Sequence, residues 1–296
     1  MRLVTCHIDD GTRAGRLEGD EVVLLDQPDV GALLASSPDW QQSAQNQEGS
    51  RVPLAEARLA PVVVCPPAIV CVGQNYAAHQ AETGAEPPAY PTLFAKYSSA
   101  LIGPNDPLVL PRVSDQVDWE VELAFVIGGR GRYVDPVEGL GLIAGYTVAN
   151  DVSVRDWQGR TSQFLQGKTF AASTPVGPAL VTPGELPDVE EMTLTCEVDG
   201  VTMQRGTAAD LIFGPAALVS YLSSILTLQP GMLVLTGTPS GIGAARRPPV
   251  FLQPGQEMRT RIEGIGELVN RCLADQDATG AQSVSSIGST AASVPG

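Results

Sequence analysis

The stretch Asp118-Trp119-Glu120-Val121-Glu122-Leu123-Ala124-Phe125-Val126-Ile127 has a second half rich in β-branched and aromatic residues, which predicts a β-strand. Successive side chains of a strand point to opposite faces, so Asp118, Glu120 and Glu122 share one face. Neighbouring carboxylates on that face lie roughly 7 Å apart, twice the rise per residue. The opposite face is apolar and predicts a core, made of Trp119, Val121, Leu123, Phe125 and Ile127.

Two explanations fit the acidic face of this strand. The strand could form the edge of a sheet, with its carboxylates in water. Alternatively, Glu120 and Glu122 point inward, where two anions repel each other and lose hydration unless a cation lies between them. The stretch alone leaves both explanations open.

Length and charge restrict the class of protein. A chain of 296 residues can form one large domain and one small one. It contains no apolar run near the roughly 20 residues of a membrane helix, and its first residues do not resemble a signal peptide, so we expect a cytoplasmic protein. A net charge of -15 argues against nucleic acid and membrane surfaces as partners. An anionic substrate would therefore need a local cation.

The cysteines and histidines limit the metal chemistry. The five cysteines are scattered without a CxxC pair, which predicts reduced, mostly buried thiols. His7 and His79 are the two histidines of the chain, so a site with many histidines is excluded. Any metal must be a hard ion held by oxygen, such as magnesium, manganese or calcium.

The chain divides into three parts. Residues 1–64 predict a small N-terminal α+β domain: an antiparallel meander over 1–26, a short helix capped by Asp29, and a polar loop over 37–52. Residues 65–275 carry strand patterns, a hairpin over 192–204 and an amphipathic helix over 215–226. Residues 276–296 are Ser, Ala, Gly and Thr with no aromatic residue, and predict a disordered tail.

Three further segments contain candidate functional residues, and for the first two a purely structural role is also possible. His79 and Glu82 share one face of a short predicted helix opened by Asn75, and form either a general base with its orienting carboxylate or a surface ion pair. Asp151 follows a predicted strand and could instead cap the next helix. The glycine-rich loop 236–243 follows a buried strand and offers backbone N–H donors to an anion.

In their order, these segments resemble the fumarylacetoacetate hydrolase family in its short prokaryotic form, which includes acylpyruvases and 2-hydroxyhepta-2,4-diene-1,7-dioate isomerases. The resemblance runs from about Cys65 to Cys272. Its motifs are CVGQNYAAHQAE (71–82), DWEVELAFVIG (118–128), AGYTVANDVSVRDWQ (144–158), GKTFAASTPVGP (167–178), the hairpin with Gln204, LIF (211–213), LTGTPSGIG (235–243) and IEGIG (262–266). The fold it implies is α+β but β-rich: a mixed β-sandwich roll with short peripheral helices, preceded here by the small N-terminal domain. The family is usually homodimeric.

The resemblance also implies roles for individual residues. Those matching the ligands of a divalent ion, usually Mg²⁺ or Mn²⁺ and Ca²⁺ in some crystals, are Glu120, Glu122 and Asp151. Lys168 matches a lysine beside that metal, and His79 with Glu82 matches the dyad that activates water in hydrolytic members. Residues that align with the lining of the substrate pocket are Lys96, Arg155, Gln158 and Thr238.

Two positions depart from the family pattern. Ala171 stands where the family often has aspartate, so we expect either a contact near the site or the substrate preference to differ from the family pattern. Trp119 stands where the family often has tyrosine, and it falls on the predicted core face, where it should change little.

The expected function is metal-dependent hydrolysis of a C–C bond in an acylpyruvate-like β-diketo acid, by way of a metal-bound enolate. Such an acid chelates a divalent ion through neighbouring oxygens, and Lys168 supplies the local cation that an anionic substrate needs. The same site could decarboxylate oxaloacetate-like acids, or isomerise or hydrate 2-hydroxy-dienoic acids. A non-catalytic protein on this fold is a third class, disfavoured by the intact metal triad and dyad.

Overall fold

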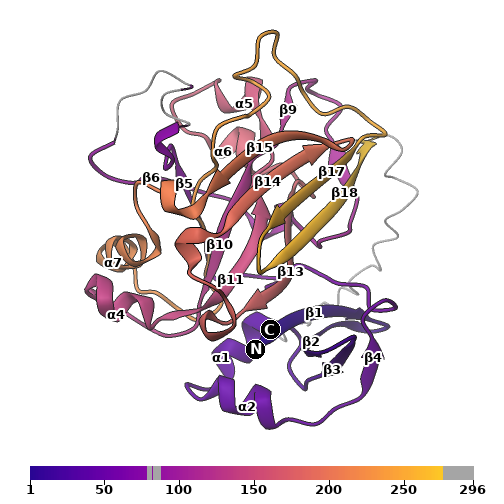
Figure 1. The fold of residues 1–296 in the computed structure, drawn as a ribbon, viewed down its shortest axis with the longest axis vertical. Helices are drawn as coiled ribbons and strands as arrows, with labels where there is room; N and C mark the ends of the chain where they lie inside the picture. The colour runs from indigo at the N-terminus through magenta and orange to yellow at the C-terminus, as the bar shows by residue number, and fades with distance from the viewer. Residues whose placement is uncertain (79–81, 83–87, 276–296) are drawn as a thin grey trace, which may run out of the picture.

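The computed structural model describes residues 1–78, 82 and 88–275, which form a β-rich protein with two large sheets and short helices (Figure 1). The mixed, β-rich class expected from the sequence is confirmed. The predicted tail lies outside the described residues.

The N-terminal part packs four antiparallel strands with two helices. Its elements are β1 (Arg2–Ile8), β2 (Gly11–Glu18), β3 (Glu21–Leu24), α1 (Val30–Ser36), α2 (Trp40–Asn46) and β4 (Arg51–Pro53). The predicted meander and the cap are confirmed: the Asp29 carboxylate accepts a hydrogen bond from the Ala32 N–H at 2.6 Å. The expected loop over 37–52 is wrong, because α2 and β4 lie there. Trp40 and Ala44, four residues apart, are buried, so packing stabilises a helix that the polar sequence of this segment does not predict.

The N-terminal strands continue the main sheet. β1 pairs antiparallel with β13 (Thr174–Val181), so the main sheet has eleven strands. Figure 1 shows the N-terminal part, in indigo, at one end of the molecule. The domain boundary near residue 64 stays a prediction.

The main sheet is mixed. Its strand order is β4-β3-β2-β1-β13-β11-β10-β16-β5-β6, with β7 beside β13. β5 pairs parallel with β16 and β7 with β13, while the other neighbours are antiparallel. Its remaining strands are β5 (Ile69–Gly73), β6 (Thr92–Ala95), β7 (Leu101–Ile102), β10 (Val121–Ile127), β11 (Ile143–Asn150) and β16 (Leu233–Leu235).

A second sheet covers the central strands. It has the order β15-β14-β17-β18-β8, formed by β15 (Val201–Thr207), β14 (Thr193–Val198), β17 (Glu257–Ile262), β18 (Gly266–Ala274) and β8 (Leu108–Leu110). Its inner side chains, such as Leu194 and Met258, belong to the same buried cluster as Val121 and Phe125 of β10. The predicted hairpin is confirmed as β14–β15. A two-stranded pair, β9 (Val117–Asp118) with β12 (Ser153–Val154), completes the strands.

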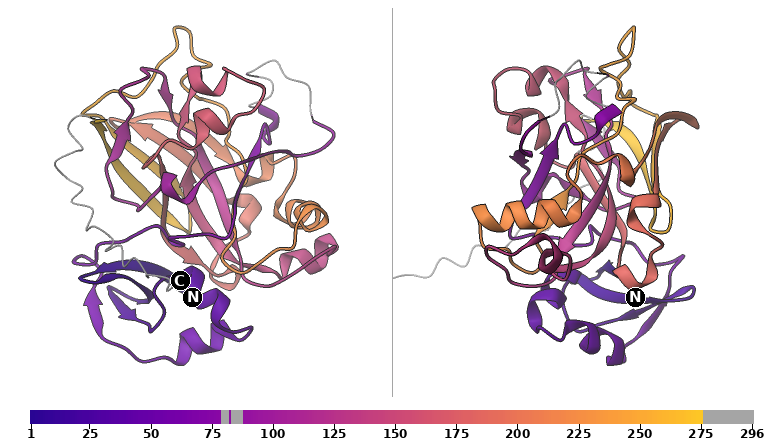
Figure 2. Two further views of the ribbon diagram at one scale, coloured as in Figure 1. Left: turned by 180° about the vertical axis from the view of Figure 1, so that it is seen from behind. Right: turned by 60° about the vertical axis from the view of Figure 1, so that its left-hand side comes forward.

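Short helices lie at the edges of the sheets (Figures 1 and 2). They are α4 (Pro136–Leu140), α5 (Arg155–Gln158), α6 (Leu165–Lys168) and α7 (Pro215–Ile225), with 3₁₀ turns η1 (Ser98–Ala100), η2 (Pro183–Glu185), η3 (Val189–Glu191) and η4 (Ala208–Asp210). α7 confirms the predicted helix opened by Pro215. α5 and α6 lie at the end of the molecule opposite the N-terminal part.

The acidic strand lies at the centre of the molecule. β10 lies between β11 and β16 and every residue of it is buried, so the edge-strand explanation is excluded. Its predicted core face is confirmed, and Ala124 and Val126 on the other face pack into a second buried cluster. The expected continuous strand is wrong: Asp118 ends β9, Val121 begins β10, and Trp119 and Glu120 belong to neither.

Two buried amide side chains satisfy the backbone at this break. The Glu120 N–H donates to Asn150 Oδ1 at 2.9 Å, and the Val121 N–H donates to Gln204 Oε1 at 2.9 Å. Gln204 also donates to Thr238 Oγ1 at 2.8 Å and to the Pro239 carbonyl at 2.9 Å. Since Gln204 belongs to β15, it joins the second sheet to the broken strand.

We expect Gln204→Leu to lower the free energy of unfolding by about 1–3 kcal/mol, because it leaves the buried Val121 N–H without an acceptor. Urea unfolding in chelator measures this loss. Gln253→Leu, at an exposed glutamine, is the matched control and should change stability by less than about 0.5 kcal/mol. Equal stability of the two variants would contradict the assigned role.

Candidate metal centre and active-site pocket

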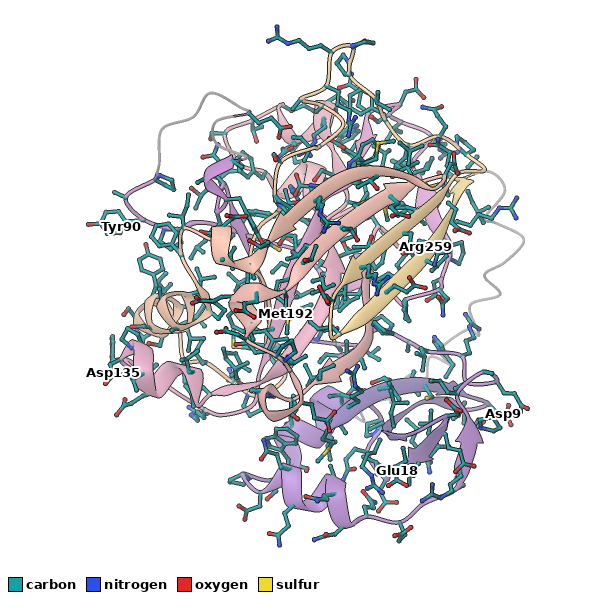
Figure 3. All side chains as sticks on the ribbon, viewed as in Figure 1. Asp9, Glu18, Tyr90, Asp135, Met192 and Arg259 are labelled. Carbon is teal, nitrogen blue, oxygen red and sulfur yellow. The ribbon has the colours of Figure 1, made fainter. Side chains whose placement is uncertain are left out.

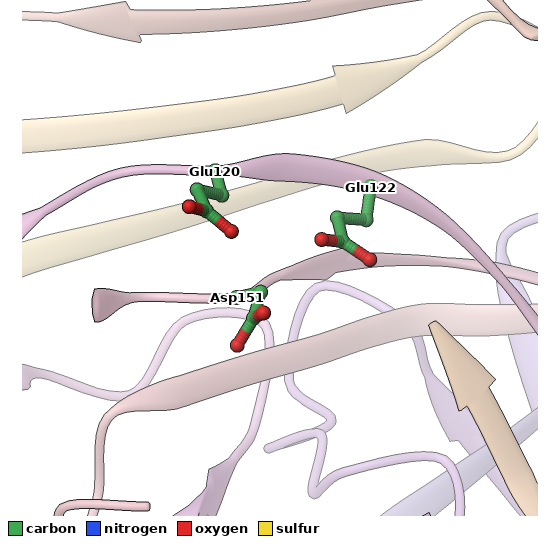
Figure 4. A group of neighbouring side chains, drawn as sticks. All are labelled: Glu120, Glu122 and Asp151. Atoms are coloured by element: carbon green, nitrogen blue, oxygen red, sulfur yellow. The ribbon is translucent and has the colours of Figure 1, made fainter. Parts of the chain in front are cut away.

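Glu120, Glu122 and Asp151 come together in the structure. Each offers a carboxylate oxygen, and these atoms lie within 4.8 Å of one another (Figure 4). The antiparallel pairing of Val121 with Asn150 places the start of β10 beside the end of β11. The Asp151 N–H also donates to the Glu120 carbonyl at 2.9 Å. All three side chains are buried.

Two buried lysines neutralise part of this charge. Lys168 Nζ lies 2.7 Å from Glu120 Oε2 and 2.7 Å from Asp151 Oδ2, and Lys96 Nζ lies 2.5 Å from Asp151 Oδ1. Burial alone would lower the pKa of Lys168, but the charges of Asp151 and Glu120 outweigh it and raise the pKa. Asp151 thus pairs with lysines, and the N-cap of α5 is Val154, so the helix-cap explanation for Asp151 is excluded.

Glu122 is the least neutralised of the three. Its Oε2 accepts a hydrogen bond from the Gly237 N–H at 2.7 Å, and it forms no ion pair with any residue that the structure describes. Burial raises its pKa well above the usual range, and the charges of Asp151 and Glu120 raise it further. Three converging carboxylate oxygens, one of them on a glutamate without a described ion pair, fit a hard divalent cation.

Glu120 and Glu122 of the triad line a pocket of about 260 Å³. Its lining combines polar residues with an apolar wall: Val72, Gly73, Gln74, Phe94, Glu120, Glu122, Arg155, Gln158, Phe164, Lys168, Thr238, Ile242 and Ala244. Of the residues expected to line the pocket, Arg155, Gln158 and Thr238 do so. Lys96 does not: its ammonium is buried against Asp151 and the Val152 carbonyl.

Arg155 is the centre of a polar network that the sequence did not predict. Its Nε donates to Asp118 Oδ2 at 2.8 Å, and its Nη1 lies 2.7 Å from Glu120 Oε1 and 2.9 Å from Gln158 Oε1. Its buried Nη2 has no hydrogen-bond partner within the described part of the chain. Burial lowers the pKa of Arg155, but the charges of Glu120 and Asp118 outweigh this effect and raise it.

The glycine-rich loop does bind anions, and these anions are the protein's own carboxylates. Gly237 N–H donates to Glu122, Gly241 N–H to Glu82 at 2.9 Å, and Gly243 N–H to Asp118 at 2.7 Å. Gly237 and Gly241 have φ of 101° and 104°, which glycine adopts without strain. The loop therefore connects the triad, the dyad carboxylate and the Arg155 network.

The predicted dyad is partly described. Glu82 is exposed and hydrogen-bonded to the loop at Gly241. His79 lies outside the described residues. Asn75, expected to cap the short helix, has another role: its side-chain amide donates to the carbonyls of Phe213 (3.0 Å) and Thr236 (2.8 Å).

The two departures from the family pattern differ in their surroundings. Ala171 is exposed in a turn after α6. Trp119 is fully buried in the core, as expected, and its indole N–H donates to the Gly241 carbonyl at 3.1 Å. The cysteines are free, and four of the five are buried. Among the described residues, no helix is long and apolar enough to cross a membrane.

The structure thus combines a mixed, β-rich fold with a buried group of three carboxylates beside a pocket. The family model for the C-terminal domain of fumarylacetoacetate (FAA) hydrolase matches residues 68–273. The chain belongs to the FAA hydrolase family.

Its relatives within the family catalyse several reactions, as their names state. The chain is 44% identical over 224 residues to the mitochondrial oxaloacetate tautomerase FAHD2A of Bos taurus, covering 75% of this chain and 71% of that one. The structure of 5-carboxymethyl-2-hydroxymuconate delta-isomerase from Mycobacterium smegmatis matches with a TM-score of 0.77 and 33% identity, over 93% of this chain and 99% of that chain. Maleylpyruvate hydrolase from Sphingobium sp. SYK-6, solved with manganese(II) and pyruvate, matches with a TM-score of 0.76 and 28% identity, over the same shares.

Without metal, we expect Glu122→Gln and Asp151→Asn to differ in sign. Glu122→Gln removes a buried charge that lacks a described cation, so the free energy of unfolding should stay equal or rise. Asp151→Asn leaves two buried lysines poorly paired and should cost about 3–5 kcal/mol. Urea unfolding in EDTA at neutral pH compares them, and a larger loss for Glu122→Gln would contradict the charge balance described here.

Proposed function

We propose that this protein is a divalent-metal-dependent enzyme that converts small 2-oxo acids through their enolates. The observation that carries this proposal is the buried triad of Glu120, Glu122 and Asp151 at a pocket that is also lined by Lys168 and Arg155. A divalent ion held by the three carboxylates would act as a Lewis acid on the 2-oxo group. The manganese and pyruvate in the maleylpyruvate hydrolase structure support this ligand class.

Two cationic side chains of the protein would stabilise the negative charges of the substrate. Lys168, fixed by two carboxylates, stabilises negative charge that develops on the enolate oxygen. Arg155 lines the pocket as a fixed cation and binds the substrate carboxylate. Phe94, Phe164 and Ile242 belong to the apolar part of the pocket lining. These cations offset the acidic surface for an anionic substrate.

The reaction we place first is keto–enol tautomerisation of an oxaloacetate-type acid, in which a proton moves between C3 and the C2 oxygen. Relatives 41–44% identical over about three quarters of the chain are named oxaloacetate tautomerases. This ranking departs from the hydrolysis expected from the sequence. Decarboxylation of the same acids shares the enolate and is measured in the same assay.

Hydrolysis of an acylpyruvate is the second candidate, and Glu82 favours it. Its carboxylate is held at Gly241, in the loop that also binds Glu122. The resemblance gives Glu82 the role of orienting His79, which would act as the general base for water. Tautomerisation needs no water nucleophile, so the two reactions depend differently on His79.

The oligomeric state and the cellular location expected from the sequence stay predictions. A homodimer is to be checked by light scattering. A cytoplasmic location is to be checked by fractionation, since the bovine relative is named as mitochondrial.

We expect purified protein to speed the decay of enol absorbance of oxaloacetate in Mg²⁺ or Mn²⁺, and to lose this activity in EDTA. Glu122→Gln should lower the rate by about 100-fold or more, because it removes a metal ligand. Glu263→Gln, at an exposed glutamate outside the pocket, is the matched control and should retain full activity. Full activity in EDTA would refute the metal dependence.

The same preparation should be tested on acylpyruvates, with His79→Ala beside the parent. If hydrolysis is a physiological reaction, the parent consumes the acylpyruvate and His79→Ala loses about 100-fold in rate, as for a general base. Turnover that is unchanged in His79→Ala would remove His79 from that role. An absence of acylpyruvate turnover would leave tautomerisation as the function.

A further inference from the structure

Asp118 lies beside the metal triad but outside it. We propose that Asp118 is a positioning residue that fixes both walls of the substrate pocket, through Arg155 on one side and the glycine-rich loop on the other. This inference rests on the proposed function, since it concerns how the carboxylate of a 2-oxo acid is held.

The carboxylate of Asp118 is saturated by donors from its own chain. It is fully buried, and its Oδ1 accepts from the N–H groups of Trp119 (2.9 Å) and Gly243 (2.7 Å). Its Oδ2 accepts from Ala244 N–H (2.9 Å) and Arg155 Nε (2.8 Å). Four N–H donors on two oxygens fix the orientation of the carboxylate and leave it poorly placed to coordinate a metal.

The polar wall of the pocket depends on this carboxylate because Arg155 does. A guanidinium is planar, so fixing its Nε and one terminal nitrogen fixes the whole group. Asp118 holds Nε, and Glu120 with Gln158 holds Nη1. Nη2 is then left as a buried donor without a described partner, in a side chain that lines the pocket. The network thus holds the guanidinium of a pocket-lining residue in one orientation.

The apolar wall depends on the same carboxylate. Ile242 and Ala244 line the pocket, and the N–H groups of Gly243 and Ala244 both end on Asp118. Gly243 allows this approach, since a Cβ there would lie 2.8 Å from Asp118 Oδ1 and 1.9 Å from the Val250 carbonyl. One buried charge therefore sets the separation between Arg155 and the loop that faces it.

Ligand binding and metal binding should consequently respond differently to a change at Asp118. Of the metal ligands, Glu122 lies on β10, Glu120 directly before it and Asp151 directly after β11, and the pairing of these two strands does not involve the Asp118 side chain. In Asp118→Asn, an amide nitrogen replaces one of the two oxygens. In one orientation Arg155 and Ala244 lose their acceptor, and in the other Gly243 of the loop loses its acceptor.

The test measures both affinities by calorimetry, with Mn²⁺ alone and then with pyruvate titrated into the manganese-loaded protein. In Asp118→Asn we expect the Kd for pyruvate to rise by about 10-fold to 100-fold, as for a lost hydrogen bond to a charged group, and the Kd for Mn²⁺ to change by less than about 3-fold. Combining it with Arg155→Lys should weaken pyruvate binding little further, because both changes disrupt one interaction.

Asp135→Asn is the matched control. Asp135 also accepts two backbone N–H groups, those of Val137 and Glu138, but it caps α4 at the edge of the molecule (Figure 3). Both affinities should be unchanged in this variant. If Asp118→Asn does not fold, the same titrations are made with Arg155→Lys alone. This variant keeps the positive charge and removes the planar guanidinium that Asp118 orients.

Unchanged pyruvate binding in Asp118→Asn, or in Arg155→Lys, would overturn the positioning role. Equal losses of Mn²⁺ and pyruvate binding would also overturn it, since they would indicate a collapse of the whole centre. A parent protein that binds neither Mn²⁺ nor pyruvate would instead refute the proposed function, and this inference with it.

Discussion

The rest of the site depends on one constraint: several carboxylates are buried together and each needs a partner. An unpaired buried carboxylate is costly, because burial removes its hydration. The protein meets this cost with cations from other segments and with backbone N–H groups from one glycine-rich loop. The carboxylates are Asp118, Glu120, Glu122 and Asp151, and the cations are Lys96, Lys168 and Arg155.

The break in the central strand follows from the same constraint. In a continuous strand, Glu120 and Glu122 would lie about 7 Å apart, and their ladder hydrogen bonds would be made by neighbouring strands. Here the two N–H groups at the break are bound by Asn150 and Gln204. The backbone at the break can therefore depart from strand geometry. The triad oxygens lie within 4.8 Å of one another.

Local patterns predicted much of this fold, and contacts between distant residues account for the rest. The alternation in 118–127 predicted the buried face of β10, and the motif order predicted the family. The break at Trp119 and Glu120 was not predictable, because its acceptors lie 30 and 83 residues further along the chain. The same holds for α2, which depends on packing.

The sequence predicted which residues form the site better than it predicted which contacts those residues make. The acidic strand left a metal site open, the family resemblance added Asp151 and Lys168 to it, and the structure brings these residues together. The loop 236–243 was correctly predicted to bind an anion, but no pattern identifies its partners as Glu122 and Glu82. Lys96 was expected to line the pocket, but it does not, and its buried ammonium forms an ion pair with Asp151.

The pairing of β1 with β13 has a consequence for how this chain is built. β13 lies next to β11, which ends at the triad, so the first strand of the chain is two strands from the metal centre. Without β1, one side of β13 would present unpaired N–H and C=O groups, a template for association with other chains. The N-terminal part therefore covers an edge of the main sheet close to the carboxylate triad.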